Sequence, residues 1–96
     1  MAGEIYKVWW IRPTEAYYAL SPEERLAVGE RARAALQQAG GEYVLICNSS
    51  WCSETWPSWG VERFPSMEAV QHHARLLEDV DALRYFTSMT LLGTMA

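Results

Sequence analysis

The sequence predicts an α+β fold with the element order β-α-β-β-α-β. Two observations support this prediction. Runs rich in β-branched and aromatic residues alternate with amphipathic stretches, and Ser, Pro and Gly residues mark the ends of these segments. The chain has 96 residues, and half of them are apolar. A chain of this size normally forms one folding unit, so we expect a single domain over residues 1–96.

The first predicted strand covers residues 5–12 and stops before Pro13, which cannot donate to a sheet ladder. Its alternating side chains are largely apolar on both faces: Ile5, Lys7, Trp9 and Ile11 on one, and Tyr6, Val8, Trp10 and Arg12 on the other. A strand that is apolar on both faces is normally covered on both. Because the helices of one small domain cover only one face, we expect a second copy of the chain on the other, and therefore a homodimer. Either Trp9 or Trp10 could face that copy.

Residues 14–20 are expected to form a loop that connects this strand to a helix. Ser21 is the predicted N-cap, Pro22 the first helical residue, and Glu24 the partner of Ser21 in a capping box. The apolar stripe of this helix consists of Val28, Ala32, Ala35, Leu36 and Ala39. Gly40 and Gly41 are expected to end the helix, because glycine tolerates positive φ angles.

The second predicted strand covers residues 42–50, and residues 51–58 form the tip of a long hairpin. The third strand covers residues 59–64 and ends at Pro65. Ser66 is the predicted N-cap of a second helix, with Glu68 in its first turn. The expected buried stripe of that helix is Met67, Val70, Ala74 and Leu77.

The second helix is expected to break near residues 79–81. A short turn over residues 82–86 follows, and a last strand covers residues 87–94. Two strand-helix-strand units of this kind form a four-stranded antiparallel sheet with two helices on one face. This is the ferredoxin-like arrangement.

Composition and motifs exclude several classes of function. The net charge is −4 and no basic stripe is present, which argues against nucleic-acid binding. The uncharged stretch of residues 43–53 is too short and too polar to span a membrane. The N-terminus lacks the features of a signal peptide, so we expect a cytoplasmic location, where Cys47 and Cys52 stay unpaired thiols. The sequence contains no nucleotide-binding glycine motif and no zinc-binding motif, so we expect neither a metal nor another cofactor.

The order of elements, together with residues 62–70 (ERFPSMEAV), resembles the dimeric α+β barrel superfamily. This superfamily includes stress-responsive barrel proteins, antibiotic-biosynthesis monooxygenases, haem-degrading monooxygenases and muconolactone-isomerase-like enzymes. The resemblance implies that two sheets pack face to face across a two-fold axis, and that each subunit keeps a pocket. It also implies a pocket-facing aromatic or His residue on the second helix, about nine residues after the strand-ending aromatic. Counted from Phe64, that residue is His73.

The haem-degrading members resemble this chain in having an Asn, a Trp and a helical His. The first strand here contains no Asn, and Asn48 follows the second strand instead. Asn48 is a candidate for stabilising an oxyanion or a peroxide, as in cofactor-independent oxygenases. The alternative is ordinary turn chemistry, for which Asn and Ser are common.

His73 is the leading catalytic candidate, since an imidazole titrates near neutral pH and this one borders the buried stripe. The alternative is a histidine at the edge of the core that bonds a backbone carbonyl. His72 points about 100° away and is expected to face solvent. Glu62 alternates with Arg63 on the third strand. An inward Glu62 would be a general base with a raised pKa, and the alternative is an edge-strand charge that prevents aggregation.

The remaining candidates would bind substrate. Arg12 could clamp a carboxylate or phosphate, or pair with Glu15 or Glu62, and Lys7 is a weaker candidate of the same kind. Trp10, Trp51 and Trp56 belong to a set of five Trp residues that suits either a flat organic ligand or a dimer interface.

Three functions follow from these candidates. The first is a small enzyme, of the cofactor-independent oxygenase or isomerase type, that acts on a hydrophobic or aromatic metabolite. The second is a dimer that binds a ligand or has a structural role without catalysis. The third is a haem-binding or haem-degrading protein in which His73 is the axial ligand.

Overall fold

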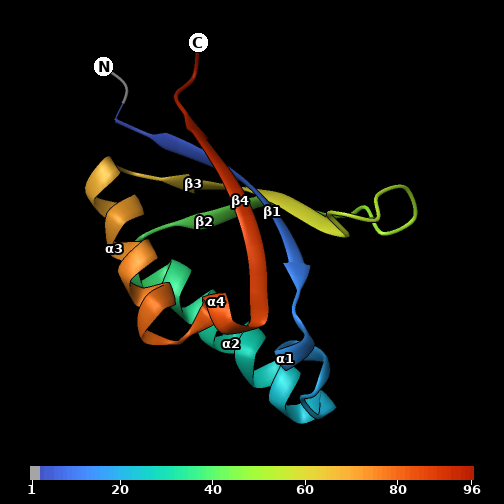
Figure 1. Cartoon of the computed structure of the whole chain (residues 1–96). Coiled ribbons are helices and arrows are strands. Elements are labelled where there is room, and N and C mark those ends of the chain that lie inside the picture. The colour runs from blue at the N-terminus through green and yellow to red at the C-terminus, as the bar shows by residue number, and fades with distance from the viewer. Residues whose placement is uncertain (1–2) are drawn as a thin grey trace.

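The computed structural model describes residues 3–96 (Figure 1). Met1 and Ala2, which formed part of the argument about the N-terminus, lie outside the described residues. The elements in chain order are β1 (Ile5–Pro13), α1 (Glu15–Tyr18), α2 (Pro22–Gln38), β2 (Glu42–Asn48), β3 (Ser58–Phe64), α3 (Met67–Asp79), α4 (Ala82–Tyr85) and β4 (Phe86–Gly93).

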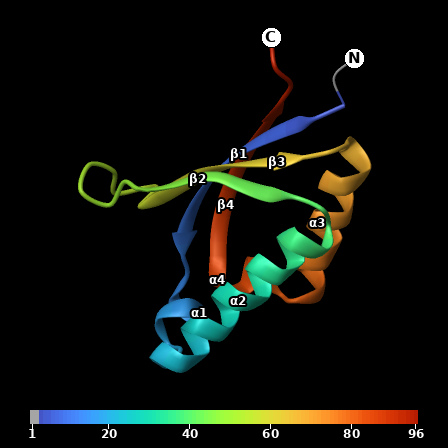
Figure 2. The same ribbon diagram turned by 180° about the vertical axis from the view of Figure 1, so that it is seen from behind.

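Within residues 3–96, the four strands form one antiparallel sheet in the order β2-β3-β1-β4. The long helices α2 and α3 contact each other and lie on the same side of the sheet (Figures 1 and 2). The predicted ferredoxin-like arrangement is therefore confirmed. None of the helices in this part of the chain is long and apolar enough to cross a membrane.

The ends of α2 confirm the predicted capping signals. The side chain of Ser21 accepts a hydrogen bond from the Glu24 backbone, and the side chain of Glu24 accepts one from the Ser21 backbone. At the other end, Gly40 has a φ of +82°. The backbone N–H of Gly41 donates to Leu36 O and that of Gly40 donates to Gln37 O, which together form a Schellman motif.

Two short helices replace segments that were predicted as a loop and a turn. The segment 14–20 contains α1, and the segment 82–86 contains α4. Thr14 joins them, because its backbone N–H donates to Tyr85 O at 2.9 Å and its hydroxyl donates to Arg84 O at 2.7 Å. Isolated helices this short are unstable. Contacts between residues about 70 positions apart hold them here, and a local pattern does not reveal such contacts.

The predicted buried stripe of the second helix is partly wrong. Ser66 caps α3 as expected, and its hydroxyl accepts from Ala69 N. The buried residues of α3 are Ala69, Val70 and His73. Met67 is 43% exposed and Ala74 is also exposed. The helix is therefore rotated so that the imidazole of His73 points toward the sheet.

The buried apolar residues that cluster into a core lie at one end of the sheet, beneath α2 and α3. They are Leu36, Phe64, Ala69 and Val70, with Ile5 packed against them. Gly41 enters this core, since a Cβ there would lie 2.5 Å from Leu36 Cδ1 and 2.8 Å from Phe64 Cε1. The tight chain reversal after α2 therefore lets the start of β2 approach Phe64.

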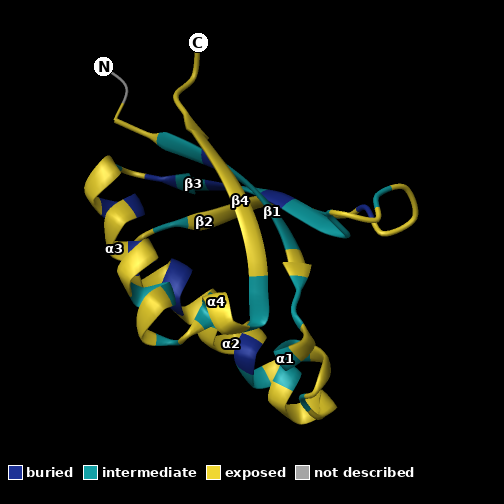
Figure 3. Ribbon diagram, in the orientation of Figure 1, coloured by how far each residue is buried: buried dark blue, intermediate teal, exposed yellow. Residues whose placement is uncertain are grey.

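The face of the sheet that points away from the helices is largely apolar, with Arg12 and Arg63 toward its two ends, and lacks a cover within residues 3–96. The strand register places Val8 opposite Val61 and Leu91, and Trp10 opposite Trp59 and Met89. Leu91 is 63% exposed, and β4 is exposed along most of its length (Figure 3). We call this surface the open sheet face. Trp10 lies on it, whereas Trp9 points toward the helices.

Candidate functional site

Three ionisable side chains meet between the sheet and α3. Lys7 comes from β1, Glu62 from the neighbouring strand β3, and His73 from α3. Lys7 and Glu62 are direct cross-strand partners, so both point to the same face. Lys7 is 9% exposed, Glu62 6% and His73 3%. Ionisable residues are seldom buried to this extent unless they are paired. We call these three residues the helix-face cluster.

Lys7 occupies the centre of the helix-face cluster. Its Nζ lies 3.1 Å from Nδ1 of His73 and 3.6 Å from Oε1 of Glu62. The ammonium group also lies 5.5 Å from the centroid of the Phe64 ring, and that ring packs against the imidazole of His73 at 5.3 Å between centroids. One aromatic residue of the core therefore contacts both nitrogen-bearing members of the cluster and fixes their positions.

Burial shifts the proton equilibria of all three groups. Desolvation, with the nearby charge of Lys7, lowers the pKa of His73 to about 4. Desolvation also lowers the pKa of Lys7, although Glu62 opposes this effect. The pKa of Glu62 is raised by burial against the opposing influence of Lys7. At neutral pH the imidazole is therefore uncharged.

Two buried polar atoms on this face have no hydrogen-bond partner among residues 3–96. One is Oε1 of Glu62, an acceptor that lies 3.6 Å from Lys7 Nζ in an ion pair but accepts no hydrogen bond, and the other is Nε1 of Trp9, a donor. Trp9 lies two residues after Lys7, and its ring packs close to Gly60, where a Cβ would come within 2.5 Å of it. Buried polar atoms in proteins nearly always have a partner, so unpaired ones call for an explanation. A ligand with a donor for Glu62 and an acceptor for Trp9 would satisfy the two atoms.

The strand β4 lies beside the helix-face cluster. Leu92 is the cross-strand partner of Lys7, and Thr90 is the partner of Trp9. Both therefore lie on the same face of the sheet as the cluster, and both are exposed. A ligand that approaches along β4 would meet an apolar side chain and a hydroxyl before it reached the buried charges.

Of the residues that the sequence identified, Glu62 and His73 lie in the helix-face cluster, where each contacts Lys7. The prediction that Glu62 could point inward is confirmed, and its pKa is raised as expected. The alternative of an edge-strand charge is wrong, because β3 lies between β2 and β1. The exposed position of His72 is also as predicted. Trp10 lies on the open sheet face, on the other side of the sheet from His73.

The remaining predicted residues lie at the hairpin between β2 and β3, except that Arg12 reaches it from β1. The guanidinium of Arg12 lies 5.6 Å from the ring of Trp56 and near the carbonyl oxygen of Thr55. Asn48 Oδ1 accepts from Ser50 N at 3.0 Å, which is turn chemistry. Trp51 is 83% exposed near the hairpin tip. Arg12 was also considered as a partner of Glu62; that pairing is wrong, since Glu62 pairs with Lys7.

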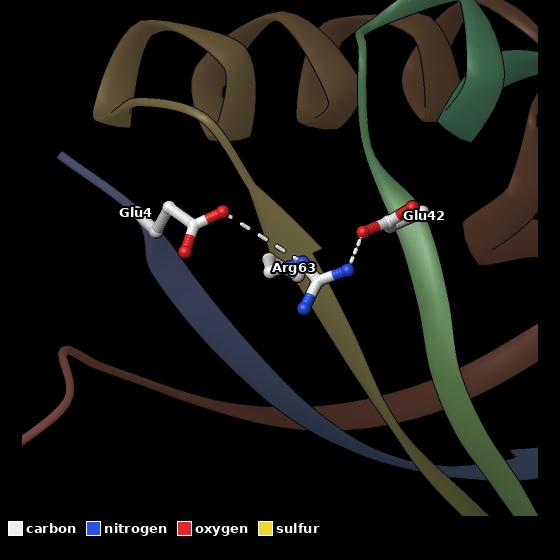
Figure 4. Close-up of polar contacts among 3 residues, drawn as sticks. All are labelled: Glu4, Glu42 and Arg63. Carbon is white, nitrogen blue, oxygen red and sulfur yellow. Dashed lines mark hydrogen bonds and ion pairs between the residues drawn. The ribbon is translucent and has the colours of Figure 1, made fainter.

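A second charged cluster lies on the opposite side of β3. Arg63 bridges Glu4 and Glu42, with its Nε 3.8 Å from Glu4 Oε2 and its Nη2 on Glu42 Oε1 (Figure 4). We call these three residues the surface cluster, because their side chains are 37–59% exposed. They link the ends of three strands. Because their side chains are exposed to water, they are poorly suited to acid–base catalysis.

Two shallow hollows flank α2. One, of about 140 Å³, lies between α2 and the end of α3, and the other, of about 130 Å³, lies between α2 and Tyr85. No predicted site residue lines either hollow. Residues 3–96 also contain no group of three or more His, Cys, Asp or Glu side chains placed to hold a metal ion.

Sequence reasoning missed the importance of Lys7 and Trp9. Lys7 was considered only as a weak ligand clamp, although it is the centre of the helix-face cluster. One signal for it was available. On its face of the strand, Lys7 is the one charged residue and its neighbours Ile5, Trp9 and Ile11 are apolar. A lysine buried in such surroundings requires a buried partner.

Comparison with known proteins supports the fold. No family model and no curated protein matches the chain. Among solved structures, the chain is similar to a chlorite dismutase variant from Candidatus Nitrospira defluvii, at 21% identity and a TM-score of 0.78. The alignment covers all of this chain but only 42% of the chlorite dismutase chain.

A second similar structure is a protein of unknown function from Rhodopseudomonas palustris, at 17% identity and a TM-score of 0.71. All of this chain aligns with 85% of that one. A methylated form of that protein gives 17% identity, a TM-score of 0.70 and 83% coverage. At these identities the similarity defines the fold alone. The chain therefore shares a ferredoxin-like fold with these proteins.

Proposed function

We propose that the protein is a homodimer that binds a hydrophobic or aromatic small molecule, with the helix-face cluster as the polar centre of its site. The observation that carries this proposal is the missing hydrogen bond at Oε1 of Glu62, a buried carboxylate oxygen whose one charged neighbour among the described residues is the Lys7 ammonium at 3.6 Å. Ion pairs that serve only stability are normally fully bonded. The indole N–H of Trp9 adds a second unpaired atom on the same face.

The chemistry that this arrangement supports best is acid–base catalysis of the isomerase type. Glu62, with its raised pKa, is suited to withdraw a proton from a hydroxyl or an activated carbon. The uncharged His73 and the indole of Trp9 are suited to hydrogen-bond the oxygen on which negative charge then develops. Lys7 keeps the site close to neutral overall while Glu62 is ionised.

The open sheet face supports the homodimer. It presents Trp10, Met89, Leu91, Trp59 and Leu45 as one apolar surface on the side away from the helices. Transfer of a fully exposed leucine into an apolar environment contributes roughly 1.5–3 kcal/mol, so the pairing of two such faces is favourable. Leu91→Lys should convert the dimer to monomer in analytical ultracentrifugation. A dimer that persists in this variant would contradict the proposed interface.

Haem fits the site less well than a small organic molecule does. A histidine that ligates a metal normally donates its second ring N–H to a carboxylate or a carbonyl. In this structure Nδ1 of His73 faces the ammonium of Lys7, which can only donate. The residues as arranged therefore do not match an axial haem ligand.

A titration with 2-naphthol tests the proposal. This probe is a flat apolar molecule whose hydroxyl can donate to Glu62 and accept from Trp9. We expect it to raise the Tm of the wild type and to shift the imidazole NMR signals of His73. The rise in Tm should disappear in His73→Phe. It should persist in Arg63→Met, which serves as the control because it changes the surface cluster instead. Equal binding by His73→Phe would contradict the site.

A titration with haemin distinguishes the proposed function from the alternative of haem binding. The proposal predicts no shifted Soret band that depends on His73. If such a band appeared in the wild type and was lost in His73→Phe, haem binding would replace the proposed function.

A further inference from the structure

Lys7 determines which atom donates and which atom accepts in its hydrogen bond with His73. A lysine ammonium carries three donor hydrogens and no lone pair, so it can only donate. Its Nζ lies 3.1 Å from Nδ1 of His73, which must therefore accept. A neutral imidazole that accepts at Nδ1 carries its hydrogen on Nε2.

Burial helps to keep Lys7 as the donor and His73 Nδ1 as the acceptor. His73 is 3% exposed, so water has little access to take the place of Lys7 at Nδ1. Glu62, 3.6 Å from Nζ, favours the charged form of Lys7 and so keeps it a donor. Tyr43 on β2 is the cross-strand partner of Glu62 and completes the set of titratable side chains around the carboxylate.

We propose that Lys7 is a positioning residue that fixes His73 in the tautomer with the hydrogen on Nε2, so that the site offers its ligand an N–H donor. The part that concerns the ligand rests on the proposed function. A donor at Nε2 selects a carbonyl, hydroxyl or ether oxygen as the recognised atom. It also rejects metal ions, which require a free lone pair at that nitrogen.

The tautomer can be measured without any ligand, by ¹⁵N NMR of the imidazole nitrogens in the whole chain at neutral pH. The wild type should show an unprotonated Nδ1 and a protonated Nε2 at His73. Lys7→Met removes the donor and should move both nitrogens toward the values of a mixed population. Lys7→Arg keeps a cationic donor and should restore the wild-type pattern. Unchanged ¹⁵N shifts in Lys7→Met would overturn the proposal.

Lys7→Met leaves Glu62 buried without its partner, and this variant can fail to fold. The double variant Lys7→Met/Glu62→Met removes both charges at similar volume and keeps the test decisive. It should show the same loss of the wild-type tautomer. A double variant that folds and retains an unprotonated Nδ1 at His73 would overturn the proposal.

The binding measurement separates this inference from the proposed function. In Lys7→Met, which retains Glu62, loss of the Nε2–H donor should weaken 2-naphthol binding by roughly three- to tenfold. The double variant also lacks the Glu62 acceptor and should bind 2-naphthol more weakly still. If the tautomer is as predicted but 2-naphthol does not bind to the wild type, the role of Lys7 stands and the proposed function fails. If 2-naphthol binds but the wild type protonates Nδ1, the inference fails alone.

Discussion

Adjacent residues of β3 belong to two charged clusters of opposite character. Glu62 points toward the helices and meets Lys7 and His73 in the helix-face cluster. Arg63 points to the other face and bridges Glu4 and Glu42 in the surface cluster. Each cluster has three members, and each joins elements that are far apart in the sequence. They differ chiefly in their access to water.

That difference determines what each cluster can do. In the helix-face cluster, desolvation is the largest cause of the shifted pKa of every member. In the surface cluster, water screens the charges, and ion pairs of this kind contribute little to stability. A strand can therefore place a reactive group and a structural group next to each other, because alternation sends them to different environments.

The largest expected contrast is in stability after one partner is removed. Lys7→Met should lower the free energy of unfolding by about 3–5 kcal/mol, because it leaves the buried carboxylate of Glu62 without a counter-charge. Urea denaturation measures this loss. The double variant Lys7→Met/Glu62→Met should recover most of it. A loss below about 1 kcal/mol in Lys7→Met would indicate that water reaches Glu62 and that the contrast with the surface cluster is false.

The next contrast is in the dependence of stability on pH. The pKa of His73 falls from 6.5 to about 4 on folding, so between these values the unfolded chain binds more protons. The stability that His73 contributes is fully present above pH 6.5 and is lost as the pH falls toward 4, by roughly 2 to 3 kcal/mol.

Glu62 acts in the opposite sense. Its pKa is raised on folding, so its contribution lowers stability as the pH rises above its unfolded value of 4.5. The difference between the wild type and His73→Phe isolates the histidine, since both proteins retain Glu62. Denaturation at pH 7 and pH 4.5 provides the comparison. A wild type and variant with the same pH dependence would show that His73 keeps an ordinary pKa.

The smallest expected effect is on the surface cluster. Arg63→Met should change the free energy of unfolding by no more than about 1 kcal/mol, and the change should shrink in high salt, which screens exposed charges. Denaturation at low and high ionic strength measures both quantities. A loss comparable to that of Lys7→Met would mean that Arg63 is as desolvated as the buried cluster.

Elements whose determinants are local could be predicted from the sequence. The capping box of Ser21 and Glu24, the cap at Ser66 and the termination at Gly40 all involve residues within a few positions of one another. The short helices α1 and α4 could not be predicted, because they depend on contacts between Thr14 and residues about 70 positions away.

Only part of the site could be predicted, because its central contact also joins residues that are far apart in the sequence. His73 and Glu62 were identified by residue type and strand alternation, but the Lys7–His73 contact joins residues 66 positions apart. That contact also explains the error at Met67 and Ala74, since the polar His73 occupies a buried position that hydrophobicity alone assigns to its neighbours. Asn48, Arg12 and Trp56 were grouped with the site, but they lie at the hairpin between β2 and β3.

The most direct test of the account is the pH titration of the His73 imidazole by NMR in the wild-type protein. The signal of His72, exposed at the preceding position of α3, provides an internal comparison. We expect His73 to titrate at about pH 4, as a buried and uncharged imidazole beside Lys7 requires. Titration of His73 near its ordinary value of 6.5 would show that the helix-face cluster is not desolvated and would contradict the account.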